Sequence, residues 1–188
     1  MTLPRSNQDW IAGIAGDGMV TVGDPRLKEP TALVRDARDV LTLLDSMTGR
    51  LRDLNGAGLA APQIGSSVRA VVIEVRRTDV FPDRPETPLL QMINPVITGR
   101  SGTEVTDWEG CFSVPGLMGQ VPRAQHVTVS YMTPDGGQVT EEYEGYAARV
   151  VQHEVDHLDG TEFLDRMRSM TTITTVQNYL AFHRGEIS

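Results

Sequence analysis

The chain has 188 residues, and 17 Lys+Arg against 25 Asp+Glu give it a formal net charge of −8. With 39% hydrophobic and 22% charged residues it has a globular composition, and its acidity argues against sequence-wide binding to nucleic acid or anionic membranes. It has no apolar run as long as a membrane helix, and its N-terminal segment matches a signal peptide poorly. It has one cysteine, Cys111, which excludes an internal disulfide. We therefore expect a cytoplasmic protein, with no membrane partner and no direct nucleic-acid binding.

The first predicted element is a long helix. Residues 1–30 hold few periodic apolar positions and are expected to be mostly irregular. From Ala32 to Leu54 the apolar residues recur at three- and four-residue steps, which predicts one amphipathic helix. Asn55-Gly56 is expected to end this helix, because both residues tolerate the left-handed conformation.

A run of strands and two further helices follow. Short segments rich in β-branched or alternating apolar residues are predicted strands: 68–75, 89–97, 103–108, 126–132 and 138–143. Residues 79–88 and 116–123 are predicted loops, and 134–137 a hairpin turn. Helical spacing returns over 145–158 and, with weak propensity, over about 172–182. Strands between an early helix and two late helices indicate an α+β domain.

The strongest chemical signal is His153-Glu154-Val155-Asp156-His157. Residues four apart lie on one face of a helix, so both imidazoles can reach one ion, and Glu154 can contact water bound to it. The alternative is a surface helix with two satisfied histidines. Because the neighbouring positions are apolar, this helix is predicted to be largely buried, which favours the metal hypothesis.

Several residues compete as the third ligand. Gly160 suits a longer protease motif, but Phe163 stands where that motif needs a histidine. The remaining candidates are Glu162, His126, His183 and Glu186, each with poor spacing or a more ordinary structural role. Cys111 is the better candidate, since a thiolate and two imidazoles suit a tetrahedral site, although a lone cysteine is usually a small buried hydrophobe.

A glycine-rich segment, Gly56-Ala57-Gly58-Leu59-Ala60-Ala61-Pro62-Gln63, lies between the first helix and the first strand. It is a poor phosphate cradle, because Ala61 stands where a glycine is needed and no strand precedes it. A plain connecting loop is one interpretation. A tight backbone path that lets a substrate strand approach, with Gln63 as an amide donor, is the other.

Taken in order, this segment, Glu109-Gly110-Cys111-Phe112-Ser113 and Gln152-His153-Glu154-Val155-Asp156-His157 resemble the three motifs of the peptide deformylases. Gly23-Asp24-Pro25-Arg26-Leu27 also resembles the N-terminal stretch of that family. The resemblance covers about residues 18–165. It implies an enzyme that removes the formyl group from N-formylmethionine at the start of nascent polypeptides, by attack of metal-bound water.

The resemblance also implies residue roles. Cys111, His153 and His157 would hold one divalent ion per chain, iron(II) natively, with zinc, nickel or cobalt able to replace it. Glu154 would be the general base and then the acid, and Gln63 and the backbone N–H of Phe112 the oxyanion donors. The residues expected to contact the formylmethionyl peptide are Gly58, Glu109 and Gly110.

We thus expect a single catalytic domain over 1–188, with a core over about 18–165 and a C-terminal helix over about 170–183. In the expected fold, mixed or antiparallel sheets pack around a central metal-binding helix. Met118 departs from the family, where many relatives carry an arginine, which puts an ion pair from that position to Glu109 in doubt. Transient ribosome contact lacks support, because the C-terminal helix has no basic cluster. The rival hypotheses are a metallo-endopeptidase and a structural metal protein.

Overall fold

The computed structural model describes residues 18–77 and 84–184. The expectations for residues 1–17, for part of the 79–88 loop and for both ends of the domain lie outside these ranges, as does Glu186. Two antiparallel sheets and several helices make up the described part, so the α+β prediction is confirmed. In this part no helix has both the length and the apolarity needed to cross a membrane.

The larger sheet has five strands in the order β1-β2-β3-β6-β7, and every neighbouring pair is antiparallel. Its strands are β1 (Gly58–Ala60), β2 (Ala70–Ile73), β3 (Leu90–Arg100), β6 (His126–Met132) and β7 (Gln138–Glu144). The predicted hairpin of β6 and β7 is confirmed. The strand β1 was predicted as part of a connecting segment, and it forms because its three residues pair with β2.

The smaller sheet has the order β4-β5-β8, with β4 at Glu104–Cys111, β5 at Val114–Ala124 and β8 at Thr174–Thr175. The prediction of a loop over residues 116–123 is wrong. These residues belong to β5, which pairs with β4 from Glu104↔Ala124 to Cys111↔Val114. Glycine and proline lowered the strand signal locally, but the long ladder to β4 outweighs that preference.

The first helix is shorter than predicted. Helix α2 spans Leu41–Asp53 and follows a 3₁₀ turn, η2, at Ala37–Val40. Residues before the turn are extended, because the side chain of Asn94 accepts a hydrogen bond from the backbone N–H of Val34 (2.9 Å) and donates one to its carbonyl (2.7 Å). The predicted end of the helix is confirmed, since α2 ends at Asp53 and Asn55 adopts the left-handed conformation, with a φ of 53°.

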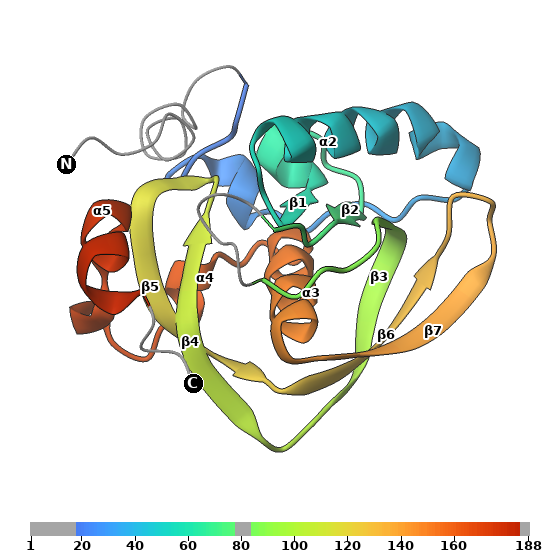
Figure 1. The fold of residues 1–188 in the computed structure, drawn as a ribbon. Helices are drawn as coiled ribbons and strands as arrows, with labels where there is room; N and C mark the ends of the chain where they lie inside the picture. Colours follow the sequence, from blue (N-terminus) through green and yellow to red (C-terminus); the bar gives the residue numbers. More distant parts are fainter. Residues whose placement is uncertain (1–17, 78–83, 185–188) are drawn as a thin grey trace.

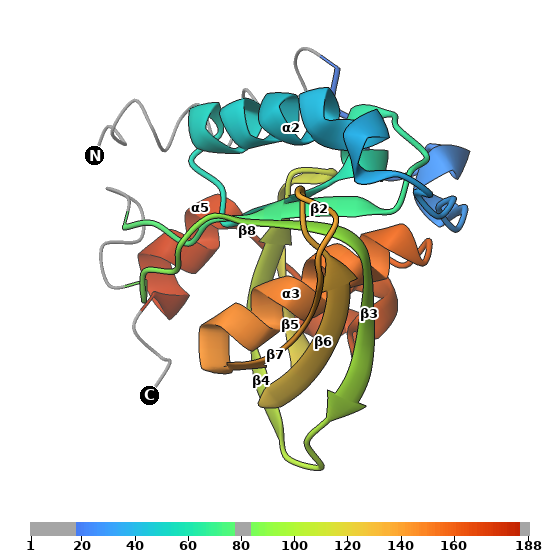
Figure 2. The same cartoon turned by 90° about the vertical axis from the view of Figure 1, so that its right-hand side faces the viewer.

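Helix α3 (Gly145–Leu158) has the predicted bounds and lies in the middle of the molecule. Figure 1 shows α3 between the two sheets, with α2 on the other side of β1 and β2, and Figure 2 shows the same layers from the side. One cluster of apolar residues joins α3 to the larger sheet and a second joins α2 to β1 and β2. The sheets and the core therefore hold α3 on several sides.

The C-terminal region differs from the single helix predicted over residues 172–182. It comprises a 3₁₀ turn, η4 (Met170–Thr172), then β8, then α5 (Val176–Asn178), which continues as a π-helical turn, η5 (Tyr179–His183). The side chain of Thr175 caps the helical part by accepting from the backbone N–H of Asn178. Two short 3₁₀ turns, η1 (Pro25–Lys28) and η3 (Ala61–Ile64), and a short helix, α4 (Phe163–Arg166), complete the described elements.

Candidate active site

Three side chains from two distant segments meet at the buried face of α3. The ligand atoms of Cys111, His153 and His157 all lie within 4.8 Å of one another, and all three residues are buried. The Cys111 sulfur lies 3.2 Å from Nε2 of His157. Helix α3 provides both imidazoles because residues four apart share a face, and the end of β4 provides the sulfur.

The chemistry of this donor set fits a divalent ion. Burial lowers the pKa of His157 well below its ordinary value, so its ring is in the neutral form that can ligate. At His153 burial opposes the charged ring, but hydrogen bonds to Cys111 and Glu109 outweigh it and raise its pKa. The neighbours of His153 thus favour a positive charge at this ring, which a bound divalent ion would supply in place of the ring proton. A thiolate with two imidazoles, and no fourth protein donor in this cluster of the described chain, matches an open tetrahedral site.

Glu109 orients His153. One oxygen of Glu109 lies 2.8 Å from Nδ1 of His153, which leaves the other ring nitrogen for the donor cluster. Arg123 pairs with both oxygens of Glu109, at 2.9 and 3.0 Å, and Arg149 with one, at 2.7 Å. Burial works against the charged form, but Arg123 and His153 hold the pKa of Glu109 below its ordinary range. Its carboxylate therefore fixes a ring in place, and both its oxygens are already occupied.

A buried ion-pair network extends from this carboxylate. Arg123 also pairs with Asp156 at 2.5 Å, and Asp156 pairs with Arg166 at 2.7 Å. Both Arg123 and Asp156 are about 5% exposed. The network thus connects β4 and β5 with α3 and α4.

Glu154 lies against strand β1. It is buried, and its Oε2 has no hydrogen-bond partner among the described residues. Burial is the main cause that raises its pKa to about 7. A Cβ added at Gly58 would collide with the Glu154 carboxylate, so a glycine is required for this close approach. The arrangement places a group able to accept and return a proton near neutral pH beside the donor cluster.

Gln63 contacts the Cys111 sulfur. Its Nε2 donates to the Cys111 sulfur and to Oγ of Ser113, both at 3.3 Å, and its Oε1 accepts from the backbone N–H of Ala60 at 2.8 Å. These contacts fix the amide in one orientation. Phe112 follows Cys111 directly and lines the same cavity as Gln63.

The competing ligands lie elsewhere. Glu162 is buried in an ion pair with Lys28 at 2.9 Å, and His126 is exposed at the start of β6. The ring of His183 packs at a tilt against Trp108, with ring centroids 4.9 Å apart. None of them belongs to the Cys111 cluster. Met118 stands where many relatives carry an arginine, and it is buried against Val176 and Tyr179. The ion pairs with Glu109 come from Arg123 and Arg149.

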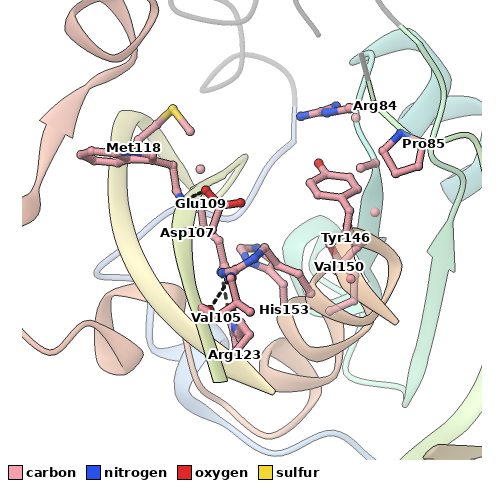
Figure 3. A pocket seen from close by; sticks show the side chains of 18 of the residues that line it. Arg84, Pro85, Val105, Asp107, Glu109, Met118, Arg123, Tyr146, Val150 and His153 are labelled. Carbon is pink, nitrogen blue, oxygen red and sulfur yellow. Dashed lines mark hydrogen bonds and ion pairs between the residues drawn. The ribbon is translucent and has the colours of Figure 1, made fainter. Parts of the chain in front are cut away.

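A cavity of about 590 Å³ opens beside the site. Figure 3 shows Asp107 and Glu109 of β4 facing Tyr146, Val150 and His153 of α3 across it. Residues from the glycine-rich segment also line it, namely Gly56, Ala57, Gly58 and Gln63, as does Gly110. The cavity therefore leads from solvent to His153 and Glu154.

Sequence reasoning missed the residues that support the site. Arg149 stands four residues before His153 and so shares its helix face, a spacing that could have identified it. Arg123 and Asp156 are buried charges, which normally need partners, but their pairing depends on contacts 33 residues apart in the sequence. No local pattern carries that information.

Comparisons with known proteins agree with this geometry. The sequence model of the polypeptide deformylase family matches residues 17–172. Peptide deformylase 2 of Bordetella bronchiseptica is 43% identical over 155 residues, which is 81% of this chain and 88% of that protein. Peptide deformylase 2 of Nostoc sp. is 37% identical over 163 residues, 86% and 91% of the two chains.

Solved structures give the same result. A class I type b peptide deformylase from Acinetobacter baumannii with Met-Ala-Ser bound superposes with a TM-score of 0.76 at 38% identity, covering 79% of this chain and 96% of that one. Peptide deformylase from Thermotoga maritima gives a TM-score of 0.71 at 34% identity, with 80% and 97% covered.

Proposed function

The chain belongs to the polypeptide deformylase family, and from that membership we propose how its own residues carry out the reaction. It is a hydrolase that removes the N-terminal formyl group from nascent peptides. The products are formate and a peptide with a free amino terminus.

Cys111, His153 and His157 hold one divalent ion in this proposal. Iron(II) is the expected native ion, and zinc, nickel or cobalt can take its place, since thiolate and imidazole ligands suit all of them. When bound, such an ion lowers the pKa of a water molecule toward ~7 and polarises the formyl carbonyl. The convergence of the three donor atoms beside Glu154, at the end of a cavity, is the observation that supports the proposal most strongly.

Glu154 moves the proton. Its free oxygen, Oε2, takes a proton from water as the oxygen of that water bonds to the formyl carbon. The same oxygen then gives the proton to the nitrogen as the C–N bond breaks. A carboxyl whose pKa burial raises to about 7 suits both steps, because it can exist in either form near neutral pH.

Two donors stabilise the negative charge that develops on the formyl oxygen. Nε2 of Gln63 and the backbone N–H of Phe112 are the proposed groups, and one such donor is typically worth ~3–4 kcal/mol. Nε2 of Gln63 already donates to the Cys111 sulfur and to Oγ of Ser113, so one of these two hydrogen bonds would be exchanged for one to the formyl oxygen. The hydrogen bond from Ala60 to Oε1 keeps the amide in place during that exchange.

The peptide backbone is proposed to run past Gly58 and Gly110. Strand β1 is at the edge of the larger sheet, so the peptide can extend that sheet by hydrogen bonding to it. Absence of a side chain at both glycines allows this close approach. Glu109 was expected to contact substrate, and in this proposal it acts on the reaction through His153.

The test uses protein purified without air, metal analysis, and formate release from formyl-Met-Ala-Ser. Glu154→Gln is expected to keep about the wild-type metal content and to lose about 10²–10⁴-fold in kcat/KM. The matched control is Glu144→Gln, just before α3, whose side chain is 81% exposed and which should retain activity. Full activity of Glu154→Gln would exclude it as the base. Cleavage within unformylated peptides without formate release would favour the endopeptidase rival.

A further inference from the structure

An N-terminal segment, residues 20–22, connects two parts of the candidate active site that are distant in sequence. The backbone N–H of Val20 donates to the carbonyl of Gln63 at 2.8 Å, and the backbone N–H of Val22 donates to the carbonyl of Ser113 at 2.7 Å. We call residues 20–22 the N-terminal strap. Because both hydrogen bonds come from one short piece of backbone, the strap fixes the position of Gln63 relative to Ser113.

Ser113 passes this constraint on to the site. It is fully buried, and each of its polar groups has a partner. Its N–H donates to the Cys111 sulfur at 3.4 Å, its Oγ accepts from Nε2 of Gln63 at 3.3 Å, and its carbonyl accepts from the strap. Phe112 directly precedes Ser113, so a shift of the Ser113 backbone also moves the N–H of Phe112. Both proposed donors to the formyl oxygen therefore depend on where Ser113 lies.

A tight turn presents the N–H of Val22 to Ser113. The backbone N–H of Asp24 donates to the carbonyl of Thr21 at 3.1 Å, which closes a turn over residues 21–24. Gly23 has a φ of 95°, as the third residue of a type II turn requires. The turn itself leaves the N–H of Val22 unused, and the Val22 side chain is 47% exposed. The main chain of Val22, rather than its side chain, therefore makes the contact with the site.

We infer that the N-terminal strap is a positioning element for the two oxyanion donors. By holding the backbones of Gln63 and Ser113, it keeps Nε2 of Gln63 and the N–H of Phe112 where both can reach one formyl oxygen. This inference rests on the proposed function. Oxyanion donors act mainly on the transition state and only from a fixed position, so a loosened strap lowers kcat more than it raises KM.

The test is Val22→Pro, which removes the N–H donated to Ser113. Proline is common at the second position of type II turns, so the turn can accept it. For formate release from formyl-Met-Ala-Ser we expect kcat to fall about tenfold, with KM within about twofold of wild type and unchanged metal content. The matched control is Val22→Ala, which keeps the N–H and should keep the wild-type kcat. Hydrogen exchange followed by mass spectrometry should show faster exchange at residues 112–113 in Val22→Pro than in Val22→Ala.

A second pair of variants decides the matter if Val22→Pro does not fold. Gly23→Ala strains the same turn, because alanine disfavours a positive φ, while its Cβ meets nothing within 4 Å. Asparagine tolerates that conformation, so Gly23→Ala should have a lower kcat than Gly23→Asn.

Three results would overturn the inference: an unchanged kcat in Val22→Pro or, where that variant does not fold, equal kcat values in the two Gly23 variants; a fall in kcat that matches a loss of bound metal; or a change confined to KM. Absence of formate release by the wild-type protein would instead overturn the proposed function, so the two failures are distinguishable.

Discussion

The side chain of Glu154 packs against the backbone of Gly58. The Glu154 carboxylate occupies the space where any other residue at position 58 would place its Cβ. Glu154, the proposed base, is carried by α3, and its contact with β1 fixes the position of its side chain. Correct geometry at this scale matters because a misplacement of about 1 Å can cost about 10²-fold in rate.

The substitution Gly58→Ala should therefore reduce kcat by about 10²-fold, because the new methyl group pushes the Glu154 carboxylate out of position. The control is Gly49→Ala on the exposed side of α2, where an added Cβ meets nothing within 4 Å. That variant should be more stable by about 0.5–1 kcal/mol, since alanine is the better helix former. Steady-state kinetics and urea unfolding of both proteins measure these effects. An unimpaired Gly58→Ala enzyme would show that this contact does not position the base.

At the scale of elements, α2 shows how tertiary contacts decide where a helix begins. The apolar periodicity continues back to Ala32, yet Ala32 pairs with Val68 in a β-bridge and Asn94 holds Val34 in an extended conformation. Leu33 is consequently 70% exposed, whereas Leu44, within α2, is 1% exposed. Periodicity identified a helix correctly but could not locate its first turn.

These exposures lead to a matched pair of predictions. Leu44→Ala should destabilise the protein by about 2–5 kcal/mol, because it leaves a cavity between α2 and the sheet. Leu33→Ala should change stability by less than about 0.5 kcal/mol, since Leu33 is largely in solvent. Denaturant unfolding monitored by circular dichroism compares the two. Equal costs would mean that residue 33 packs into the core, contrary to this structure.

At the scale of the whole molecule, the buried ion pairs connect the layers. Arg123 joins Glu109 on the neighbouring strand to Asp156 on α3, and through Glu109 it reaches His153. Removal of this one guanidinium would leave two carboxylates buried without their main partner. The same residues therefore hold the small sheet on α3 and set the orientation of a proposed metal ligand.

Arg123→Leu should for this reason cost about 3–5 kcal/mol of stability, the range measured when one partner of a buried pair is removed. The exposed pair of Arg38 and Asp36 offers the control, because solvent screens it, and Arg38→Leu should have little effect. Thermal and urea unfolding of metal-loaded proteins measure both changes. Unchanged stability of Arg123→Leu would show that water or neighbouring groups compensate the two buried carboxylates.

The sequence by itself determined the α+β class, helix α3 and the presence of a histidine pair on one helix face. These are local properties: spacing of three, four or two residues decides which side chains share a face, and α3 keeps its predicted bounds. The three short motifs also identified the family, and the comparisons confirm that prediction.

Only the tertiary structure decided which groups lie next to that histidine pair. It brought Cys111 within 3.2 Å of His157, made residues 114–124 a strand, and paired Arg123 with Glu109 and Asp156. The three side-chain contacts join residues 46, 14 and 33 positions apart, so no local pattern encodes them. They form because burial in a shared core makes an unpaired charge or backbone group costly, and only the folded chain determines which partner is within reach.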